Sequence, residues 1–417
     1  MLIDRYLPPS DSVVFHAAVI TAGVERTYTA LRRFDFFQVP LVRLPNLMRL
    51  WPERLWRRLR GRAPLPPAPQ RVMLEDLLAM KSFDVLAEEP GRELVLGSVG
   101  RFWTRDFGRV PFTRETFATL APPDCGKIGW SLRVEPYGEH RSLVIVDVRV
   151  STTDAAAHAH FRRYWRGVGT AVRWMTRSSI ARVKKALERT VVPQEVSGPA
   201  LLLERQLPAF DKVQLFLRRV TADAARTYDA ARRVDQLMSQ DPVNRVFGAV
   251  RDAPRRLAAR LGLRASRRAV PESATTPFLL LDERPGEEYV VGLIGRFWEA
   301  GVGLVPFTPK GFKAFHTPGY AKVALNYAVR ALSPGTTLLI SEIRTALTDA
   351  EALRHFNRRY WWWLAPFAYG VMRRPLTLIQ RAAEFWPTRR LWPARALLPA
   401  RAPVLFSRPI ERLTPLV

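Results

Sequence analysis

The chain has 417 residues, of which 47% are apolar and 25% are charged, as in ordinary folded globular proteins. Its formal net charge of +27 comes mostly from arginine, which predicts a surface that attracts phosphate groups unless the excess only reflects a GC-rich genome. A single cysteine, Cys125, excludes an intramolecular disulfide and favours a reducing compartment, while no run of about 18 apolar residues indicates a membrane span.

The elements of the first half are predicted from hydrophobic periodicity and turn signals. They are, in chain order, a strand at 13–20, helices at 23–34 and 40–60, a proline-rich loop at 61–69, strands at 83–89, 93–103, 127–135 and 142–150, and a helix at about 155–188. Thr153 and Asp154 are expected to cap the last helix. The first residues carry no basic segment followed by an apolar core, so we expect a cytoplasmic protein.

The second half repeats the first. The motifs GRFW at 100–103 and VPFT at 110–113 return 195 residues later, at 295–298 and 305–308. Nearer the N-terminus the spacing is 200 residues, since the RTY at 26–28 matches 226–228. We therefore predict a tandem duplication, with one domain at 1–195, a second at 201–396 and a basic, proline-rich tail at 397–417.

One copy combines antiparallel hairpins with one long C-terminal helix. The hairpins form a sheet whose apolar face must be covered, and only the long helix is large enough to cover it. The predicted fold class is α+β, with two tandem helix-grip domains, each a curved antiparallel sheet wrapped around a long C-terminal α-helix. Such an arrangement leaves a cleft between sheet and helix, the default place for a ligand.

This element order, the GRFW hairpin and the TDA…F(N)RRYW start of the last helix resemble the START-like or Bet v 1-like helix-grip superfamily. The resemblance covers about residues 1–190 and 201–390, and is to actinobacterial-type members of unassigned role. The superfamily includes polyketide cyclases and lipid-transfer domains, so the resemblance implies a pocket for a hydrophobic molecule. It implies no catalytic residues, because no catalytic signature is shared across the superfamily.

Arg101 and Arg296 stand in otherwise apolar columns of the GRFW strands. An arginine in such a column needs an anionic partner or an exit to solvent. Asp147 and Glu342, in the last strand of each copy, are the expected partners. The arginines would then anchor a carboxylate or phenolate in the cleft, and the alternative is an ion pair on the outer face of the sheet.

Aromatic residues that recur in both copies are the other candidates for lining the cleft, with plain core packing as the alternative. The complete set of predicted cleft residues is Arg101, Trp103, Phe112, Asp147, Trp165, Arg296, Trp298, Phe307, Glu342 and Trp361.

No catalytic or metal-binding constellation recurs in both copies. Only His160 has a counterpart, His355, and each stands near the start of a helix, where capping or surface roles are expected. No Ser-His-Asp, Cys-His or paired-carboxylate set is repeated, so the sequence favours a non-catalytic protein without a cofactor.

Tryptophans accompany arginines in two segments, which is typical of an interfacial membrane segment. The membrane-surface candidates are Trp51, Trp56, Arg57, Arg58, Trp386, Arg389, Arg390 and Trp392. The alternative is a solvated helix face. Nucleic acid is not an expected partner, because zinc, helix-turn-helix and RNP motifs are absent from the sequence.

Three functions stay open at this point. The first is binding or transfer of a hydrophobic small molecule or lipid, possible also at an anionic membrane surface. The second is a polyketide aromatase/cyclase-like enzyme, and the third is an interaction protein whose clefts are filled. Pro366 and Pro375 interrupt the last helix of copy two, so we expect that helix to bend there and the two clefts to differ.

Overall fold

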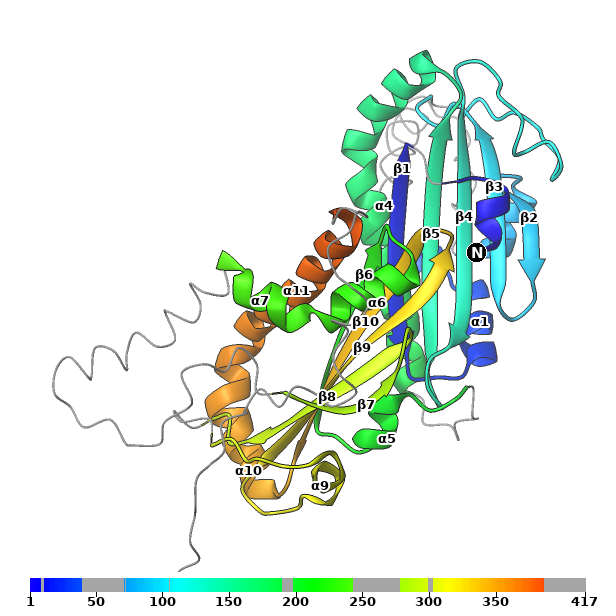
Figure 1. The fold of residues 1–417 in the computed structure, drawn as a ribbon. Coiled ribbons are helices and arrows are strands. Elements are labelled where there is room, and N and C mark those ends of the chain that lie inside the picture. The colour runs from blue at the N-terminus through cyan, green and yellow to red at the C-terminus, as the bar shows by residue number, and fades with distance from the viewer. Residues whose placement is uncertain are drawn as a thin grey trace, which may run out of the picture. The chain divides into compact units, whose positions relative to one another are not determined.

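The computed structural model describes residues 1–8, 11–39, 71, 73–104, 106–189, 198–242, 278–298 and 303–385. The chain divides into two compact units, Met1–Leu201 and Leu202–Val417 (Figure 1). The predicted tail at 397–417 and the predicted helix at 40–60 lie outside the described residues.

Unit 1 contains a five-stranded antiparallel sheet with strand order β1-β5-β4-β3-β2. Its elements are η1 (Leu2–Arg5), β1 (Ser12–Ile20), α1 (Val24–Arg32), η2 (Phe36–Gln38), α3 (Leu74–Ala79), β2 (Asp84–Glu89), β3 (Glu93–Gly100), β4 (Gly126–Pro136), β5 (Ser142–Thr152) and α4 (Ala155–Arg189). Helix α4 packs along one face of this sheet (Figure 1).

Unit 2 repeats the plan, with strand order β6-β10-β9-β8-β7. Its elements are α5 (Leu202–Gln206), β6 (Lys212–Val220), α6 (Ala224–Arg232), α7 (Val234–Gln240), β7 (Leu279–Arg284), β8 (Glu288–Gly295), α9 (Pro309–Ala314), β9 (Ala321–Ser333), β10 (Thr336–Leu347), α10 (Ala350–His355), the π-helical turn η3 (Phe356–Trp361) and α11 (Trp362–Phe385). The predicted fold class, two antiparallel sheets each with a long C-terminal helix, is confirmed.

Local signals in the sequence place these elements. Gly91 and Gly286 take φ angles of +77° and +81° in the β2–β3 and β7–β8 turns, a region that favours glycine. Asp154 caps α4 as predicted, because its Oδ1 accepts the Ala157 N–H at 2.7 Å. Asp349 accepts the Ala352 N–H at the same distance, so the cap is duplicated with the unit.

The sheet of unit 1 is covered on both faces. On the α4 face, Ile180, Val183 and Leu187 pack against β4, β5 and α1. On the opposite face, η1 and the segment that follows β3 form a second apolar cluster around Ile3 and Phe117. Every residue of β3 is consequently buried.

The last helices of the two units differ by one residue. Copy two carries Asn357 between the equivalents of Phe161 and Arg162, and the structure accommodates the extra residue as the π-helical turn η3. Beyond this turn the helix keeps its orientation to the sheet, since Ile379 and its equivalent Val183 are both buried in the core. The departure from α-helical geometry therefore precedes Pro366 and Pro375, and a bend at these prolines stays a prediction.

Two glycines of unit 1 should respond oppositely to alanine. A Cβ on Gly97 would lie 2.7 Å from Leu86 and 2.8 Å from Phe117, so we expect Gly97→Ala to lower the free energy of unfolding by about 1–3 kcal/mol. Gly167 has open space around its Cβ position and lies inside α4, so Gly167→Ala should raise stability by about 0.5–1 kcal/mol. Urea unfolding of both variants tests the pair, and equal effects would contradict the packing described for β3.

Candidate functional site

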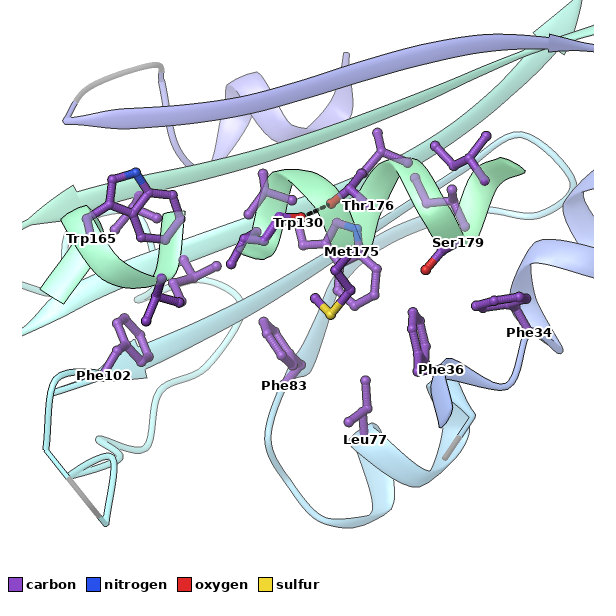
Figure 2. A pocket seen from close by; sticks show the side chains of 18 of the residues that line it. Phe34, Phe36, Leu77, Phe83, Phe102, Trp130, Trp165, Met175, Thr176 and Ser179 are labelled. Carbon is purple, nitrogen blue, oxygen red and sulfur yellow. Dashed lines mark hydrogen bonds between the residues drawn. The ribbon is translucent and has the colours of Figure 1, made fainter. Parts of the chain in front are cut away.

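A cavity of about 330 Å³ lies in unit 1 between α4 and the sheet (Figure 2). This volume is within the range of small-molecule pockets in proteins. Its walls come from the sheet, from α4, from the segments that precede β2 and from Phe102, which follows β3. The lining residues are Leu31, Phe34, Phe36, Leu77, Phe83, Phe102, Ile128, Trp130, Leu132, Val146, Val148, Val150, Phe161, Tyr164, Trp165, Val168, Val172, Met175, Thr176, Ser179 and Ile180.

The sheet wall follows from strand alternation. Alternate residues of β4 and β5 point toward α4, and they are apolar at each of these positions of the wall. Phe36 and Phe83 each approach the Trp130 ring edge-on, at 5.8 Å between centroids. These contacts fix the indole at the centre of the cavity wall.

Polar groups in this cavity are few and uncharged. Among the described residues that line it, none carries a formal charge. Thr176 donates its hydroxyl to the Val172 carbonyl at 2.9 Å. Burial raises the pKa of the Tyr164 phenol, so that group stays protonated at neutral pH.

Two further polar atoms of the cavity wall have no hydrogen-bond partner among the described residues. They are the Trp130 indole Nε1 and the Ser179 hydroxyl, and both atoms are buried. Buried polar groups in native proteins are nearly always hydrogen-bonded, so an exception needs an explanation. Neither residue was among the sequence-predicted candidates.

Of the predicted residues of unit 1, Trp165 lines the cavity, stacked at 5.2 Å on Phe161. Trp103 lies 5.9 Å from the His160 ring and does not line the cavity, whereas its neighbour Phe102 does. Phe112 packs on Phe117 in the cluster on the opposite face of the sheet.

The expected pairing of Arg101 with Asp147 is wrong. Arg101 is 47% exposed, and its Nε lies 3.6 Å from Asp124 Oδ2. Asp147 is fully buried on the opposite face of the sheet, where it accepts a hydrogen bond from Arg149 Nε at 2.9 Å.

The error has two causes. The column of Val95 and Val99 faces the cluster away from α4. Arg101 follows the end of β3 at Gly100, whereas Asp147 lies level with Val95.

The expected pairing of Arg296 with Glu342 in unit 2 is also wrong. Glu342 is buried and accepts from Arg344 Nε at 2.7 Å, while Arg296 lies over the Tyr320 ring at 4.4 Å. Phe307 packs on Phe312, away from the helix.

Trp298 meets Phe356 of the π-helical turn edge-on at 6.2 Å. The side chain of Trp361 lies outside the described residues, as do all eight membrane-surface candidates. In the described ranges no helix is long and apolar enough to cross a membrane, and no three metal-ligating side chains gather. Adsorption to an anionic membrane stays an expectation.

The α4-type face of unit 2 is filled differently. Tyr289 and Tyr327 stand where unit 1 has Leu94 and Leu132, and both tyrosines are buried. Their rings stack with centroids 5.4 Å apart, and the Tyr289 hydroxyl donates to the Ala231 carbonyl at 2.6 Å. Here the buried polar group has a partner.

No protein-family model and no curated protein matches the chain. Similar solved structures include the di-domain ARO/CYC BexL from the BE-7585A biosynthetic pathway, with 13% identity, a TM-score of 0.18, and 90% of this chain and 100% of that chain covered.

Two others are similar at the same level. The di-domain ARO/CYC StfQ from the steffimycin biosynthetic pathway has 11% identity and a TM-score of 0.21, covering 89% of this chain and 96% of its own. DynU16, from the dynemicin biosynthetic locus, has 11% identity and a TM-score of 0.20, covering 90% and 100%. The fold class is given by the strand order and helix placement of this chain.

Proposed function

We propose that unit 1 binds a hydrophobic small molecule in the cavity between α4 and the sheet. The observation that carries the proposal is the cavity itself, which has a volume of about 330 Å³ and is lined mostly by aromatic and aliphatic side chains, without a charged group in its described lining. Each Å² of apolar ligand surface removed from water contributes about 25 cal/mol to the free energy of binding, so such a pocket strongly favours a hydrophobic ligand.

A second candidate function is an aromatase/cyclase-like reaction on a polyketide. It belongs to the range of activities in the superfamily that the sequence resembles. The observation in its favour is a row of hydroxyls on one wall, from Tyr164, Thr176 and Ser179 of α4. Binding comes first because the described lining holds no paired acid and base.

Native mass spectrometry of the purified full chain tests the proposal directly. We expect a co-purifying small molecule, or, after its removal, saturable fluorescence enhancement with the neutral probe N-phenyl-1-naphthylamine. Val168 lines the cavity, so Val168→Trp should fill it and weaken probe binding at least about tenfold. The exposed Arg166 on the same helix supplies the control Arg166→Trp, which should bind the probe normally.

The outcomes separate the three functions. A bound molecule that leaves with unchanged mass supports binding, whereas loss of water from an added polyketide-like ketone supports the enzyme. Absence of any bound molecule and of probe binding would favour an interaction protein with a closed cleft.

A further inference from the structure

The wall of the unit 1 cavity contains two hydrogen-bond donors for which no described residue is the acceptor. Both atoms are covered by neighbouring side chains, so a ligand reaches them by displacing those neighbours. We infer that this cavity recognises an uncharged aromatic ketone or quinone, whose carbonyl oxygens accept hydrogen bonds from Trp130 Nε1 and the Ser179 hydroxyl. The inference rests on the proposed binding function and names the class of its ligand.

Ser179 carries the clearest signal. A serine or threonine inside a helix ordinarily turns its hydroxyl back to the carbonyl four residues earlier, and Thr176 does so with Val172. The Ser179 hydroxyl makes no such bond, although the residue is only 9% exposed. Figure 2 shows this hydroxyl leaving α4 toward the space beside Phe34 and Phe36.

Trp130 supplies the second donor from the facing wall. Its indole Nε1 can only donate, and the atom is buried without a partner. The ring is held by its edge contacts with Phe36 and Phe83, so the donor has a defined direction. Leaving both donors unpaired costs the protein stability, which a ligand acceptor would restore.

The chemistry of the wall sets the charge of the ligand. A carboxylate or phosphate buried here would lack a cation, because the described lining offers only neutral donors, and burying an unpaired charge is prohibitive. A cationic ligand would likewise lack an anion. A carbonyl oxygen accepts from indole and hydroxyl groups without any charge, and aromatic rings suit a wall that includes Phe83, Phe102 and Trp165.

The duplication provides an internal comparison. At the equivalent positions unit 2 has Leu325 in place of Trp130 and Pro375 in place of Ser179. Both donors are thus specific to unit 1. The buried hydroxyl of Tyr289 in unit 2 is instead satisfied by a backbone carbonyl. Carbonyl recognition by this pair of donors is therefore assigned to unit 1.

The experiment compares fluorene with fluorenone, two flat three-ring molecules that differ by one carbonyl, using quenching of intrinsic tryptophan fluorescence in the full chain. We expect wild-type protein to bind fluorenone about tenfold more tightly than fluorene, the effect of one net hydrogen bond in an apolar site. Ser179→Ala and Trp130→Phe should each reduce the ratio of fluorenone to fluorene affinity severalfold. Because the ratio is taken within each variant, any change in the cavity wall that affects both molecules alike cancels.

Matched controls exist on the same helix. Ser178→Ala and the half-exposed Trp174→Phe should keep the wild-type preference. Circular dichroism checks that each variant is folded. If Trp130→Phe does not fold, Ser179→Ala alone tests the inference. Without ligand, Ser179→Ala should melt at or above the wild-type temperature, because it removes a buried hydroxyl that lacks a partner.

Failure of this inference differs from failure of the proposed function. Equal binding of fluorene and fluorenone by wild type, or a preference that survives in Ser179→Ala and Trp130→Phe together, would overturn carbonyl recognition and leave the hydrophobic pocket standing. No binding of either molecule, with no co-purifying ligand, would overturn the pocket and this inference with it.

Discussion

Replacing Arg149 with methionine should lower the free energy of unfolding by about 3–5 kcal/mol, the cost of leaving a buried charge without its partner. The Arg149 side chain is fully buried, and its Nη1 donates to Asp4 Oδ1 at 2.7 Å and to the Leu7 carbonyl at 2.9 Å. Its Nε donates to the equally buried Asp147. Arg149→Met therefore leaves one carboxylate buried without its partner and removes the contact that holds η1 to the sheet.

The balance of forces on this guanidinium agrees with that role. Burial lowers the pKa of Arg149, and the hydrogen bonds and charges of Asp147 and Asp4 raise it by more, so its pKa lies above the usual value. Urea unfolding at neutral pH measures the loss. The double variant Asp147→Leu/Arg149→Met should be more stable than Arg149→Met alone, because it no longer buries the unpaired carboxylate of Asp147.

Arg101→Met is the matched control for this prediction. Arg101 is 47% exposed and 3.6 Å from its acid, so the substitution should change stability by no more than about 0.5 kcal/mol. A loss as large as that of Arg149→Met would contradict the placement of the two arginines. It would also restore Arg101 as a buried anchor.

The hydrogen-bond network of Arg149 has a counterpart in unit 2. In unit 2, Arg344 donates to Glu342 and to the Leu207 carbonyl, and its Nη2 lies 3.7 Å from Glu204. In both units the arginine ties the N-terminal turn of the unit to the face of the sheet away from the long helix. The recurrence of this network marks it as part of the fold and not of a ligand site.

This network also shows what the sequence could and could not predict. Asp147 and Arg149 are two apart on one strand, so they share a face and reach each other before either reaches another strand. That spacing could have paired them from the sequence. The existence of a second apolar layer on the outer face, formed by η1 and the segment after β3, could not be predicted, because neither stretch has strong periodicity.

The sequence allowed a better prediction of the fold than of the site. Repetition, hairpin turns and the Asp154 cap were enough to predict the two sheets and the long helix. The cavity depends on which side chains leave space, a property of packing among distant residues. Only the alternation of Ile128, Trp130 and Leu132, and a serine within the apolar stripe of α4, hinted at its polar groups.

Alkaline pH should destabilise unit 2 more than unit 1. In unit 2, burial raises the pKa of Tyr228, Tyr289 and Tyr327, with Glu283 adding to the effect at Tyr228. In unit 1, burial and the hydrogen bond to Glu88 raise the pKa of Tyr28 to about 12, and burial raises that of the half-buried Tyr164. Among the described tyrosines, three buried ones in unit 2 thus have a raised pKa, whereas unit 1 has Tyr28 and Tyr164 with a raised pKa, and Tyr137 is also buried there.

The direction of the pH effect follows from the linkage between proton release and unfolding. A phenol whose pKa is higher in the folded than in the unfolded chain stabilises the fold fully below pH about 10, and that contribution is lost as pH rises through the folded pKa. For Tyr28 the window runs from about 10 to about 12, and because solvent screens this part-buried phenol the loss of stability stays below about 3 kcal/mol. The three phenols of unit 2 lose their contributions together over a window that begins at the same pH.

Hydrogen exchange at pH 8 and pH 11, read separately on peptides from β4 and β9, measures each unit in the intact chain. We expect protection to fall further in β9. Tyr327→Phe keeps the ring and removes the ionisable hydroxyl, so it should lessen the alkaline loss in β9, while Tyr28→Phe should lessen the loss in β4 only. If Tyr327→Phe leaves the alkaline behaviour of β9 unchanged, ionisation of this buried phenol does not drive the loss, because in that variant no proton can leave the position.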